Sequence, residues 1–430
     1  MIDIALIRET PEQLRDALSK RGESVSVVDE ILSLDTQRRT QLQDSEALRL
    51  QRNQISKAMG QIKDTDERAQ QQAKVKAIKQ DLSNIETQLA QIQSELDARL
   101  NALPNIPSEA TPVGASEDEN VILSPEITPP VPAYPVRPHW ELTDSVNRID
   151  FDQGVKLCGS RFYVLHGDFA RLQRALIAYL LQNHSDAGYH ETLLPVMVHE
   201  SVVYASGQLP KFRDNLYKDH ESNIFFAPTA EVPLTSLYAK EVLTQDALPQ
   251  RLCAYSPCFR REKASAGRDV RGIKRGHQFD KVELYTLCSP EQAAQELDHM
   301  KDTAVHACEA LGLSYRVKQL CTGDLGFAAQ TTFDIEVWAP GCQEWLEVSS
   351  VSHCGDFQAR RAHIKYRSEV KGKANFLHTL NGSGLGIPRT MIAILEQYQR
   401  PDHWIEVPSV LQSFMQCERI ALKPVTDQVR

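Results

Sequence analysis

Residues 29–103 constrain the fold most strongly, because Gly60 is the only glycine in this stretch and proline is absent from it. The second half of the stretch repeats apolar residues alternately three and four positions apart, which is the seam of a heptad pattern. The first half follows the same repeat more loosely. Both halves are therefore predicted to be long helices. The seam of the second half comprises Val75, Ile78, Leu82, Ile85, Leu89, Ile92 and Leu96, followed by Leu100.

A turn is expected between the two halves, at Gly60 and the polar residues 63–66. Two helices of about 36 residues would form an antiparallel hairpin about 50 Å long, since each residue adds 1.5 Å. The hairpin suits either a dimerisation coiled coil or an arm that reaches a large partner. Acidic residues balance the basic ones, so charge does not decide between these roles. The candidate contact cations are Arg38, Arg49, Arg52, Lys74, Lys76 and Lys79.

Nine of the 22 prolines lie between Pro104 and Pro138, which predicts an extended linker. This linker divides the chain into residues 1–103, with the hairpin at about 29–103, and a larger domain at 139–430. The larger domain mixes patterns typical of helices and strands. We expect an α+β fold with a mainly antiparallel sheet, because runs of strands have few helices between them. The expected elements are a helix over 168–184 and strands over 191–198, interrupted by Pro195, 252–262, 278–287, 333–338 and 345–350.

The cysteines and the N-terminal sequence indicate a reducing compartment. Nine cysteines occur without any CxxC pair, which is typical of free thiols. The opening residues MIDIALIRETPEQ lack the apolar core of a signal peptide, and no apolar run is long enough for a membrane span. We expect a cytoplasmic protein that makes no use of a membrane. The net charge of −9 argues against nonspecific coating of nucleic acid but allows a local basic face.

The segment from Phe259 to Leu284 predicts a site for a polyphosphate and a flat base. Arg260 and Glu262 would share one face of a strand, and Phe279 and Glu283 would share one face of the next strand. A solvated ion pair and a charged surface loop are the alternative interpretation. The loop between the two strands is rich in cations, namely Arg261, Lys263, Arg268, Arg271, Lys274 and Arg275.

Three other segments carry polar groups suited to an anion, a cation or a small substrate. Residues 381–384, NGSG, are expected to form a glycine turn before a helix over 389–399, and Arg389 at that helix N-terminus favours an anion. Glu347 and Ser350 offer oxygen ligands suited to Mg²⁺, although a turn and a cap would use the same residues. Residues 229–231 place Thr and Glu in an apolar setting. A P-loop motif is absent from the sequence.

Six segments in this order resemble the class II aminoacyl-tRNA synthetases, and among them the seryl-tRNA synthetases, over essentially the whole chain. They are the heptad hairpin, GQLPKF from Gly207, TAEVPLT from Thr229, FRRE…GHQFDKVEL from Phe259, EVSS with DFQARR from Glu347, and NGSG…PRT from Asn381.

The resemblance implies a serine–tRNA ligase that uses ATP and Mg²⁺ and forms a homodimer through the 168–184 helix and the Pro195 strand. Arg260, Glu347 and Arg389 would be catalytic, and Glu347 and Ser350 would hold the metal. ATP would contact Arg260, Arg261, Glu262, Arg275, Phe279, Glu347, Val348, Ser349, Ser350 and Arg389. L-Serine would contact Thr229, Ala230, Glu231, Glu283, Asn381 and Ser383.

The resemblance also implies that the hairpin grips tRNA(Ser), with tRNA(Sec) as a second candidate. Two alternatives are a ligase that loads serine onto a carrier protein, whose relatives lack the arm, and a synthetase-like binding protein without catalysis. A purely structural coiled-coil protein would leave residues 139–430 unexplained. The chain departs from the commonest family pattern beside the implied ligands, at Val351, His353, Gly355 and Pro388.

Overall fold

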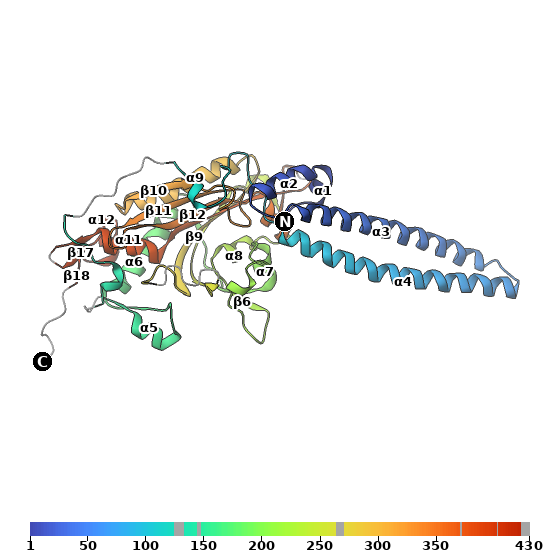
Figure 1. Cartoon of the computed structure of the whole chain (residues 1–430), viewed down its shortest axis with the longest axis horizontal. Coiled ribbons are helices and arrows are strands. Elements are labelled where there is room, and N and C mark those ends of the chain that lie inside the picture. Colours follow the sequence, from blue (N-terminus) through green and yellow to red (C-terminus); the bar gives the residue numbers. More distant parts are fainter. Residues whose placement is uncertain (124–132, 144–147, 264–270, 370–371, 402, 423–430) are drawn as a thin grey trace. The chain divides into compact units, whose positions relative to one another are not determined.

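A computed structural model of the chain describes residues 1–123, 133–143, 148–263, 271–369, 372–401 and 403–422 (Figure 1). The chain divides into two compact units, residues 1–104 and residues 105–430. Each unit is described by itself below.

The first unit is helical, and its two long helices form the predicted hairpin. The helices α3 and α4 run side by side (Figure 1). Asp64 caps α4, because its side chain accepts hydrogen bonds from the backbone N–H groups of Asp66 and Glu67 at 2.8 and 3.0 Å. The turn therefore falls where the sequence predicted it. The helices are α1 (Ile4–Glu9), α2 (Pro11–Lys20), α3 (Ser26–Met59) and α4 (Thr65–Ala102).

Polar contacts between α3 and α4 establish that the helices are antiparallel. Arg99 pairs with Glu30 at 2.9 Å, and Arg49 pairs with Glu86 at 3.2 Å, so positions further along α3 meet earlier positions of α4. The seam side chains are buried or half-buried between the helices, as the heptad pattern predicts.

A small core at the base of the hairpin was not predicted from the sequence. The short helices α1 and α2 pack there against the beginning of α3, and Ile7, Leu14 and Ile31 are fully or almost fully buried. The carboxylate of Asp35 in α3 is buried with them and accepts hydrogen bonds from the Arg8 guanidinium at 2.6 and 2.7 Å. This ion pair joins α1 to the long helix.

The second unit is built on an eight-stranded sheet. Every pair of neighbouring strands in it is antiparallel except β4 with β8, which confirms the predicted sheet type. In spatial order the strands are β1 (Val121–Ile122), β10 (Tyr315–Gln319), β11 (Thr331–Ala339), β12 (Glu344–His353), β15 (His378–Gly386), β9 (Gln278–Cys288), β8 (Gln250–Phe259) and β4 (His190–Glu191).

Smaller elements complete the unit. The helices are α5 (Phe151–Cys158), α6 (Asp168–Asp186), α7 (Glu200–Ala205), α8 (Glu231–Thr235), α9 (Ala293–Ala310), α10 (Phe357–Ala362), α11 (Ile387–Gln397) and α12 (Ser409–Met415). The short strands are β2 (Ile149–Asp150), β3 (Val164–Leu165), β5 (Met197–His199), β6 (Ile224–Phe226), β7 (Val242–Thr244), β13 (Lys365–Arg367), β14 (Asn375–Phe376), β16 (Gln399–Arg400), β17 (Trp404–Glu406) and β18 (Arg419–Ala421). The 3-10 helices are η1 (Glu117–Glu119), η2 (His139–Glu141), η3 (Arg213–Asn215) and η4 (Gln245–Ala247).

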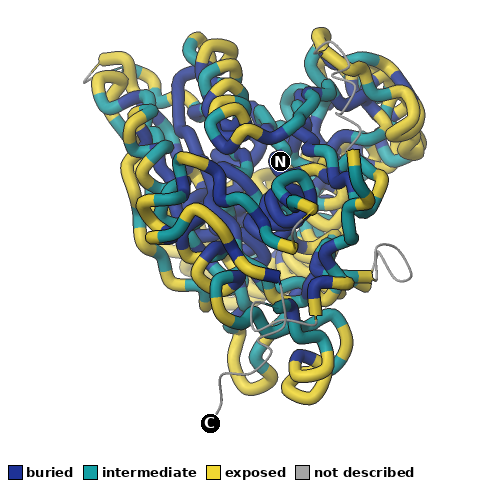
Figure 2. The backbone as a smooth tube through the Cα atoms, turned by 90° about the vertical axis from the view of Figure 1, so that its left-hand side faces the viewer, coloured by how far each residue is buried: buried dark blue, intermediate teal, exposed yellow. Residues whose placement is uncertain are grey.

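The two faces of the large sheet are covered differently. The long helices α6, α9 and α11 pack on one face and form the main core with strand residues such as Val282 and Leu284. The other face, which carries Tyr285 and Leu287, packs against residues of the short helices α8 and α10. Runs of buried residues lie in the interior of the unit, and exposed residues lie mostly toward its outside (Figure 2). The thinly covered face leaves room for a site.

Several expected elements need correction. The strand predicted over 191–198 is two strands, β4 and β5, because the chain breaks around Pro195 and the halves pair with different sheets. The strand predicted over 252–262 ends at Phe259. Residues 381–384 form part of β15 rather than a turn, since they pair with β9 and β12. The helix expected over 389–399 is α11, with Pro388 in its first turn.

The described part of the proline-rich segment lies against the second unit. The backbone N–H of Asn105 donates to the carbonyl of Phe327, and that of Ser108 donates to the carbonyl of Gln330, both at 2.9 Å. The segment then adds β1 to the edge of the sheet. Within the part of the chain that the structure describes, no helix has the length and apolar character needed to cross a membrane.

Candidate active site

Three adjoining cavities open on the thinly covered face of the large sheet. Their volumes are about 520, 170 and 430 Å³. Arg260, Phe279 and Arg389, which are far apart in the sequence, all line the 170 Å³ cavity. Arg275 lines all three cavities, and Arg260 is shared by the first two. The segments expected to form one nucleotide site therefore do meet in space.

The register of the strands explains this convergence. Ser383 of β15 lies opposite Glu283 of β9, and Asn381 of β15 lies opposite Ser352 of β12. Paired residues project from the same side of a sheet, as do residues two apart on one strand. Phe279 and Glu283 therefore share their face with Asn381 and Ser383, while the alternate positions of these strands face the main core.

Arg260 lies beyond the end of β8, so it does not share a strand face with Glu262 as the sequence suggested. Its Nε donates to the carbonyl of Pro228 at 3.2 Å, and its guanidinium lies 5.0 Å from the centre of the Phe279 ring. Glu262 has φ of +49°, and its carboxylate is 3.7 Å from Arg275. The chain turns here because the ladder has ended, and the turn brings both charged groups to the cavities.

Not every cation of the predicted loop reaches the site. The Arg261 guanidinium lies 5.9 Å from the ring of Tyr217, and Arg261 lines none of the three cavities. Arg268 lies outside the described residues. Lys274 lines the 170 and 430 Å³ cavities and forms an ion pair with Glu344.

Arg389 connects the beginning of α11 to β12. Its Nη1 donates to the carbonyl oxygen of Glu347 at 2.7 Å and lies 3.5 Å from the Glu347 carboxylate. Pro388 precedes it in the first turn of α11, where the missing N–H costs no helical hydrogen bond. The guanidinium is thus held at the border of the 170 and 430 Å³ cavities.

A bulge in β12 brings four oxygen-bearing side chains to one face. Ser349 pairs with Ile335, but the next pair is Glu347 with Glu336, so Val348 is the extra residue. Glu347 and Ser350 consequently share a face with their partners Glu336 and Asp334. All four line the 430 Å³ cavity.

Asp334 is the most unusual acid of this group. Burial, and then the charge of Glu347, raise its pKa well above the ordinary value. Its Oδ1 is buried and has no hydrogen-bond partner among the described residues. Glu336, by contrast, pairs with Arg316 at 2.6 Å and Lys318 at 2.7 Å.

The residues expected to bind serine form a buried polar network beside the 520 Å³ cavity. The hydroxyl of Thr229 donates to the carboxylate of Glu283 at 2.7 Å, and Lys281 forms an ion pair with the same carboxylate. Ala230 is buried and offers no polar side chain. Glu231, at the start of α8, lines the cavity, and burial followed by the charge of Glu283 raises its pKa to about 7.

The remaining predicted residues lie on β12 and β15. Asn381 lines the 520 Å³ cavity and donates to the thiol of Cys354 at 3.3 Å. Val348 and Ser383 line the 170 Å³ cavity. The Ser349 hydroxyl donates to the Ser383 carbonyl at 2.6 Å, so this side chain ties the two strands together.

The four departures from the family pattern have separate structural settings. Val351 is buried against Gly382 in the main core, and His353 pairs with His378 at 3.0 Å. Gly355 has φ of +56°, a conformation that favours glycine. Pro388 alone lines a cavity of the site.

Comparison with known proteins identifies the family. The family model described as the seryl-tRNA synthetase N-terminal domain matches residues 1–107, and that of the tRNA synthetase class II core domain (G, H, P, S and T) matches residues 212–398. A serine–tRNA ligase of Chloroflexus aurantiacus is 51% identical over 418 residues, covering 96% of this chain and 98% of that protein. One of Dehalococcoides mccartyi is 47% identical over 421 residues, covering 98% and 100%.

The chain belongs to the seryl-tRNA synthetase family.

Solved structures agree with this assignment. The seryl-tRNA synthetase of Pyrococcus horikoshii, complexed with ATP, superposes with a TM-score of 0.90 at 34% identity, covering 99% of this chain and all of that one. The cytoplasmic serine–tRNA ligase of Naegleria fowleri, in complex with AMP, superposes with a TM-score of 0.84 at 29% identity, covering 98% and 99%. The resemblance and the fold class expected from the motifs are confirmed, and the chain is an aminoacyl-tRNA ligase.

Sequence reasoning missed several residues of this seryl-tRNA synthetase site. Lys281 stands between Phe279 and Glu283 on the same face of β9, so the alternation of the strand already carried a signal for it. Asp334 likewise lies two positions before Glu336 on a predicted strand. Gln358 donates to Glu231 at 2.6 Å, and no local pattern indicated that contact.

The basic residues expected on the arm differ in their surroundings. Lys74, Lys76 and Lys79 are exposed on α4. Arg38 contacts Asp35 and Gln93, and Arg49 pairs with Glu86, so both take part in holding the hairpin together. Arg52 donates to the neighbouring Asn53 at 3.4 Å.

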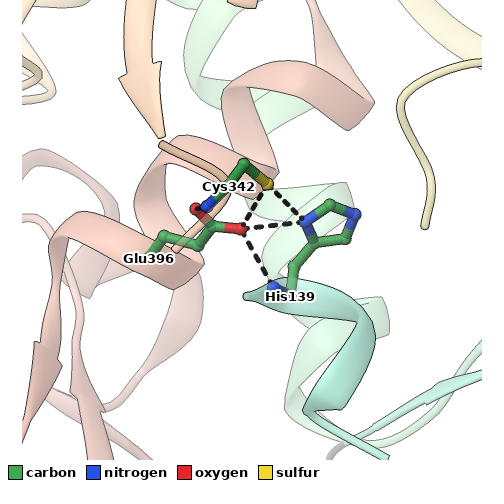
Figure 3. Close-up of side chains that lie close together, drawn as sticks. All are labelled: His139, Cys342 and Glu396. Atoms are coloured by element: carbon green, nitrogen blue, oxygen red, sulfur yellow. Dashed lines mark hydrogen bonds and ion pairs between the residues drawn. The ribbon is translucent and has the colours of Figure 1, made fainter. Parts of the chain in front are cut away.

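His139, Cys342 and Glu396 form a cluster (Figure 3), and none of the three lines a cavity of the site. Among the described residues it is the one group of three His, Cys, Asp or Glu side chains whose ligand atoms all lie within 4.8 Å of one another. Glu396 Oε1 accepts from the backbone N–H of His139 and from its Nδ1, both at 2.9 Å, and from Cys342 at 3.1 Å. Its Oε2 accepts from two further backbone N–H groups.

Hydrogen bonding assigns this cluster a structural role. Nε2 of His139 accepts from the backbone N–H of Ile273 at 3.1 Å, so Nδ1 carries the ring proton. A metal bound to Nδ1 would require the ring proton to move to Nε2. Two N–H donors, that of His139 and that of Ile273, would then face each other and their hydrogen bond would be lost. The cluster instead joins η2, the end of α11 and the loop that leads to Lys274 and Arg275.

Proposed function

We propose that the chain activates L-serine with ATP to give seryl-adenylate and pyrophosphate, and then transfers the seryl group to the 3′ end of tRNA(Ser). The observation that carries the proposal is that Arg260, Phe279 and Arg389 line one cavity, which adjoins the cavity lined by Glu231 and Asn381. A cationic, aromatic pocket beside an acidic polar one suits ATP lying against an amino acid.

The first step needs positioning and charge stabilisation rather than a protein nucleophile. The serine carboxylate oxygen attacks the α-phosphorus, and the bond to the pyrophosphate oxygen breaks. Arg260 and Arg275 would face the developing negative charge, and Phe279 would stack on adenine. Arg389, held by Glu347, would meet the outer phosphates. Fixed cations at such positions lower the barrier because they need no reorganisation during the reaction.

Serine would be recognised by its ammonium and hydroxyl groups. Glu283 is buried, and its carboxylate contacts both Thr229 and Lys281. The ammonium group of Lys281 already contacts this carboxylate. The ammonium group of serine would therefore share the Glu283 carboxylate with Lys281. A site that hydrogen-bonds the serine hydroxyl would reject alanine by roughly 10⁴-fold, since the polar groups around the missing hydroxyl would be left unpaired.

Mg²⁺ fits the oxygen-bearing face of β11 and β12. Glu347 and Ser350 would hold it, and the unpartnered Oδ1 of Asp334 supports a cation there, because an unpaired buried carboxylate oxygen is costly. When bound, the ion would neutralise charge on the phosphates. Lys274 and Arg275 line the same cavity and would contribute fixed positive charge.

In the second step the terminal ribose hydroxyl of tRNA attacks the seryl carbonyl and AMP leaves. Residues 1–103 would bind the tRNA through the arm. Residues 139–430, together with the part of the 104–138 segment that adds β1 to the large sheet, would form the catalytic domain. Binding would follow RNA shape and phosphate charge rather than base sequence. tRNA(Sec) is a second candidate substrate. The family match over residues 1–107 favours tRNA over a carrier protein as the acceptor.

The working enzyme would be a homodimer in the cytoplasm. Two large apolar side chains flank Pro195 in a solvent-facing position, with Leu193 91% exposed and Met197 59% exposed. The apolar side of α6 is already packed in the main core, so the dimer contact would use the Pro195 segment rather than that side of the helix. All nine cysteines are free thiols, which suits a reducing compartment.

Serine-dependent ATP–pyrophosphate exchange tests the proposal directly. With each of the twenty amino acids supplied in turn, exchange is expected with serine alone. If none of the twenty amino acids supports exchange, the result would instead favour a binding protein without catalysis. Exchange with serine but no charging of tRNA would favour a carrier-protein ligase.

A further inference from the structure

Gln358 of α10 uses its whole hydrogen-bonding capacity inside the protein. Its side chain is completely buried. Nε2 donates to the carbonyl of Ser206 at 2.9 Å and to Oε1 of Glu231 at 2.6 Å. Oε1 accepts from the hydroxyls of Thr379 at 2.7 Å and Tyr285 at 3.1 Å. Two donors and two acceptor positions are all that an amide side chain offers.

These partners fix which way the amide points. The Ser206 carbonyl can only accept, so it must face the NH₂ group of Gln358. The second N–H is then directed at Glu231. If the amide were turned over, its oxygen would face both a carbonyl and a carboxylate. The hydroxyls of Tyr285 and Thr379 hold the other side of the amide.

Glu231 is the group on which this donor acts, and it faces the 520 Å³ cavity beside Arg260 and Asn381. Burial and the charge of Glu283 raise the pKa of Glu231 to about 7, while Lys281, the Gln358 hydrogen bond and Arg260 oppose that rise. The titratable and charged groups around it come from β9, from the segment after β8 and from the end of β12. They are Lys281, Glu283, Tyr285, Arg260 and Cys354.

We propose that Gln358 is a positioning residue of the serine subsite, whose side-chain amide holds the Glu231 carboxylate toward the cavity as an ionised hydrogen-bond acceptor. The inference rests on the proposed assignment of Glu231 to serine. The fixed N–H group of Gln358 can only donate, so it favours the ionised form of Glu231, whose oxygens only accept. Protonation of Glu231 would place a second donor on the same carboxyl group. Gln358 thereby extends the pH range in which serine binds.

The test compares the wild-type chain with Gln358→Met by ATP–pyrophosphate exchange between pH 5.5 and 9. Methionine keeps the approximate volume but donates no hydrogen bond. A hydrogen bond to a charged group shifts a pKa by about one unit. The rise of the serine KM toward low pH, the acidic limb of the profile, should therefore begin about one pH unit higher in Gln358→Met. At pH 7 the serine KM should rise about fivefold, and the ratio of variant to wild type should fall toward one at pH 9. The KM for ATP should change less than twofold.

Tyr285→Phe is the matched control, because it removes a hydroxyl from the opposite side of the same amide. It leaves the N–H bond to Glu231 in place, so the midpoint of the acidic limb should stay at its wild-type value. A serine KM raised by the same factor at every pH in Gln358→Met would mean a purely structural role and would overturn the proposal.

Glu231→Gln keeps the test decisive even if Gln358→Met does not fold. This variant cannot ionise, so the acidic limb of the serine KM should disappear. A limb that persists in Glu231→Gln would overturn the proposal. If the wild-type chain shows no serine-dependent exchange, the proposed function itself is wrong. If it shows exchange but the variants leave the limb unmoved, only the role of Gln358 is wrong.

Discussion

Glu347 and Ser350 project from the same face of β12 although they are three residues apart on a strand. Residues at this spacing face opposite sides of a regular strand. The bulge at Val348 removes the mismatch by placing Glu347 opposite Glu336 and Ser350 opposite Asp334. One extra residue in the ladder thus assembles the oxygen ligands proposed for Mg²⁺.

Ser350→Ala should weaken the metal dependence of exchange. The change removes one oxygen from the proposed ion site without touching Arg389, and the Mg²⁺ concentration for half-maximal exchange should rise about tenfold. Titration of exchange with Mg²⁺ measures this. Ser352→Ala is the control, since Ser352 lines the same cavity but its hydroxyl already pairs with that of Thr332 at 2.9 Å, so the value should change less than twofold. Equal effects of the two variants would remove Ser350 from the proposed ligand set.

The exposed lysines of α4 should set part of the salt dependence of tRNA binding. Replacing Lys74, Lys76 and Lys79 with alanine should lower tRNA affinity and reduce the slope of log K against log salt by about 2. Filter binding over a range of salt concentrations measures the slope, and exchange without tRNA should stay unchanged. Lys156→Ala, an exposed lysine of α5 outside the arm, is the control. An unchanged slope in the triple variant would contradict the role given to these lysines.

Leu193→Asp should dissociate the proposed homodimer. The side chain is 91% exposed in the single chain, so a charge there costs little unless a partner covers it. Sedimentation should detect monomers of the variant at concentrations where the wild type is dimeric. Leu157→Asp changes another exposed leucine, which is 70% exposed, and should leave the dimer intact. A wild-type chain that sediments as a monomer would rule the dimer out.

Much of the site was predictable because its residues occur in motifs whose strands alternate regularly. Phe279 and Glu283 were correctly placed on one face, and the same alternation pointed to Lys281. Arg260 and Glu262 were assigned to a strand wrongly, because nothing local indicates that the ladder ends at Phe259. The bulge at Val348 depends on the register with β11, and the contact of Gln358 with Glu231 joins segments 127 residues apart. Tertiary pairing decides such features, so a linear pattern does not contain them.

The base of the arm should owe part of its stability to the ion pair of Arg8 with Asp35. Arg8→Ala leaves a buried carboxylate with fewer hydrogen-bond partners and should cost about 2 kcal/mol in unfolding free energy at pH 7. The hydrogen bond from Arg8 lowers the pKa of Asp35 in the folded chain. The stability that this ion pair contributes is present above the pKa of Asp35 in the unfolded chain, about 3.9. It is lost as the pH falls through the lower pKa of Asp35 in the folded chain.

The difference between Arg8→Ala and wild type should therefore shrink below about pH 4. Thermal unfolding of the full chain, followed by helical circular dichroism, measures it. Arg15→Ala is the control, because Arg15 pairs with the exposed Asp29 and should change stability little. A difference that stays constant from pH 7 to pH 3 would show that Asp35 ionisation is not its source.

Gly272 should be essential for the position of the loop that carries Lys274 and Arg275. Its φ is +76°, and an added Cβ would lie 2.0 Å from Nε2 of His139, the atom that accepts from Ile273. Gly272→Ala should displace the loop from His139 and raise the KM for ATP about tenfold, while the KM for serine changes much less. Gly159→Ala is a matched control, since Gly159 has φ of +91° but nothing within 4 Å of the added Cβ. Gly159→Ala introduces the same kind of backbone strain but no contact between the added Cβ and another residue. The KM of this variant for ATP should stay near the wild-type value. If both alanine variants raise the KM for ATP equally, backbone strain rather than the contact with His139 controls the loop.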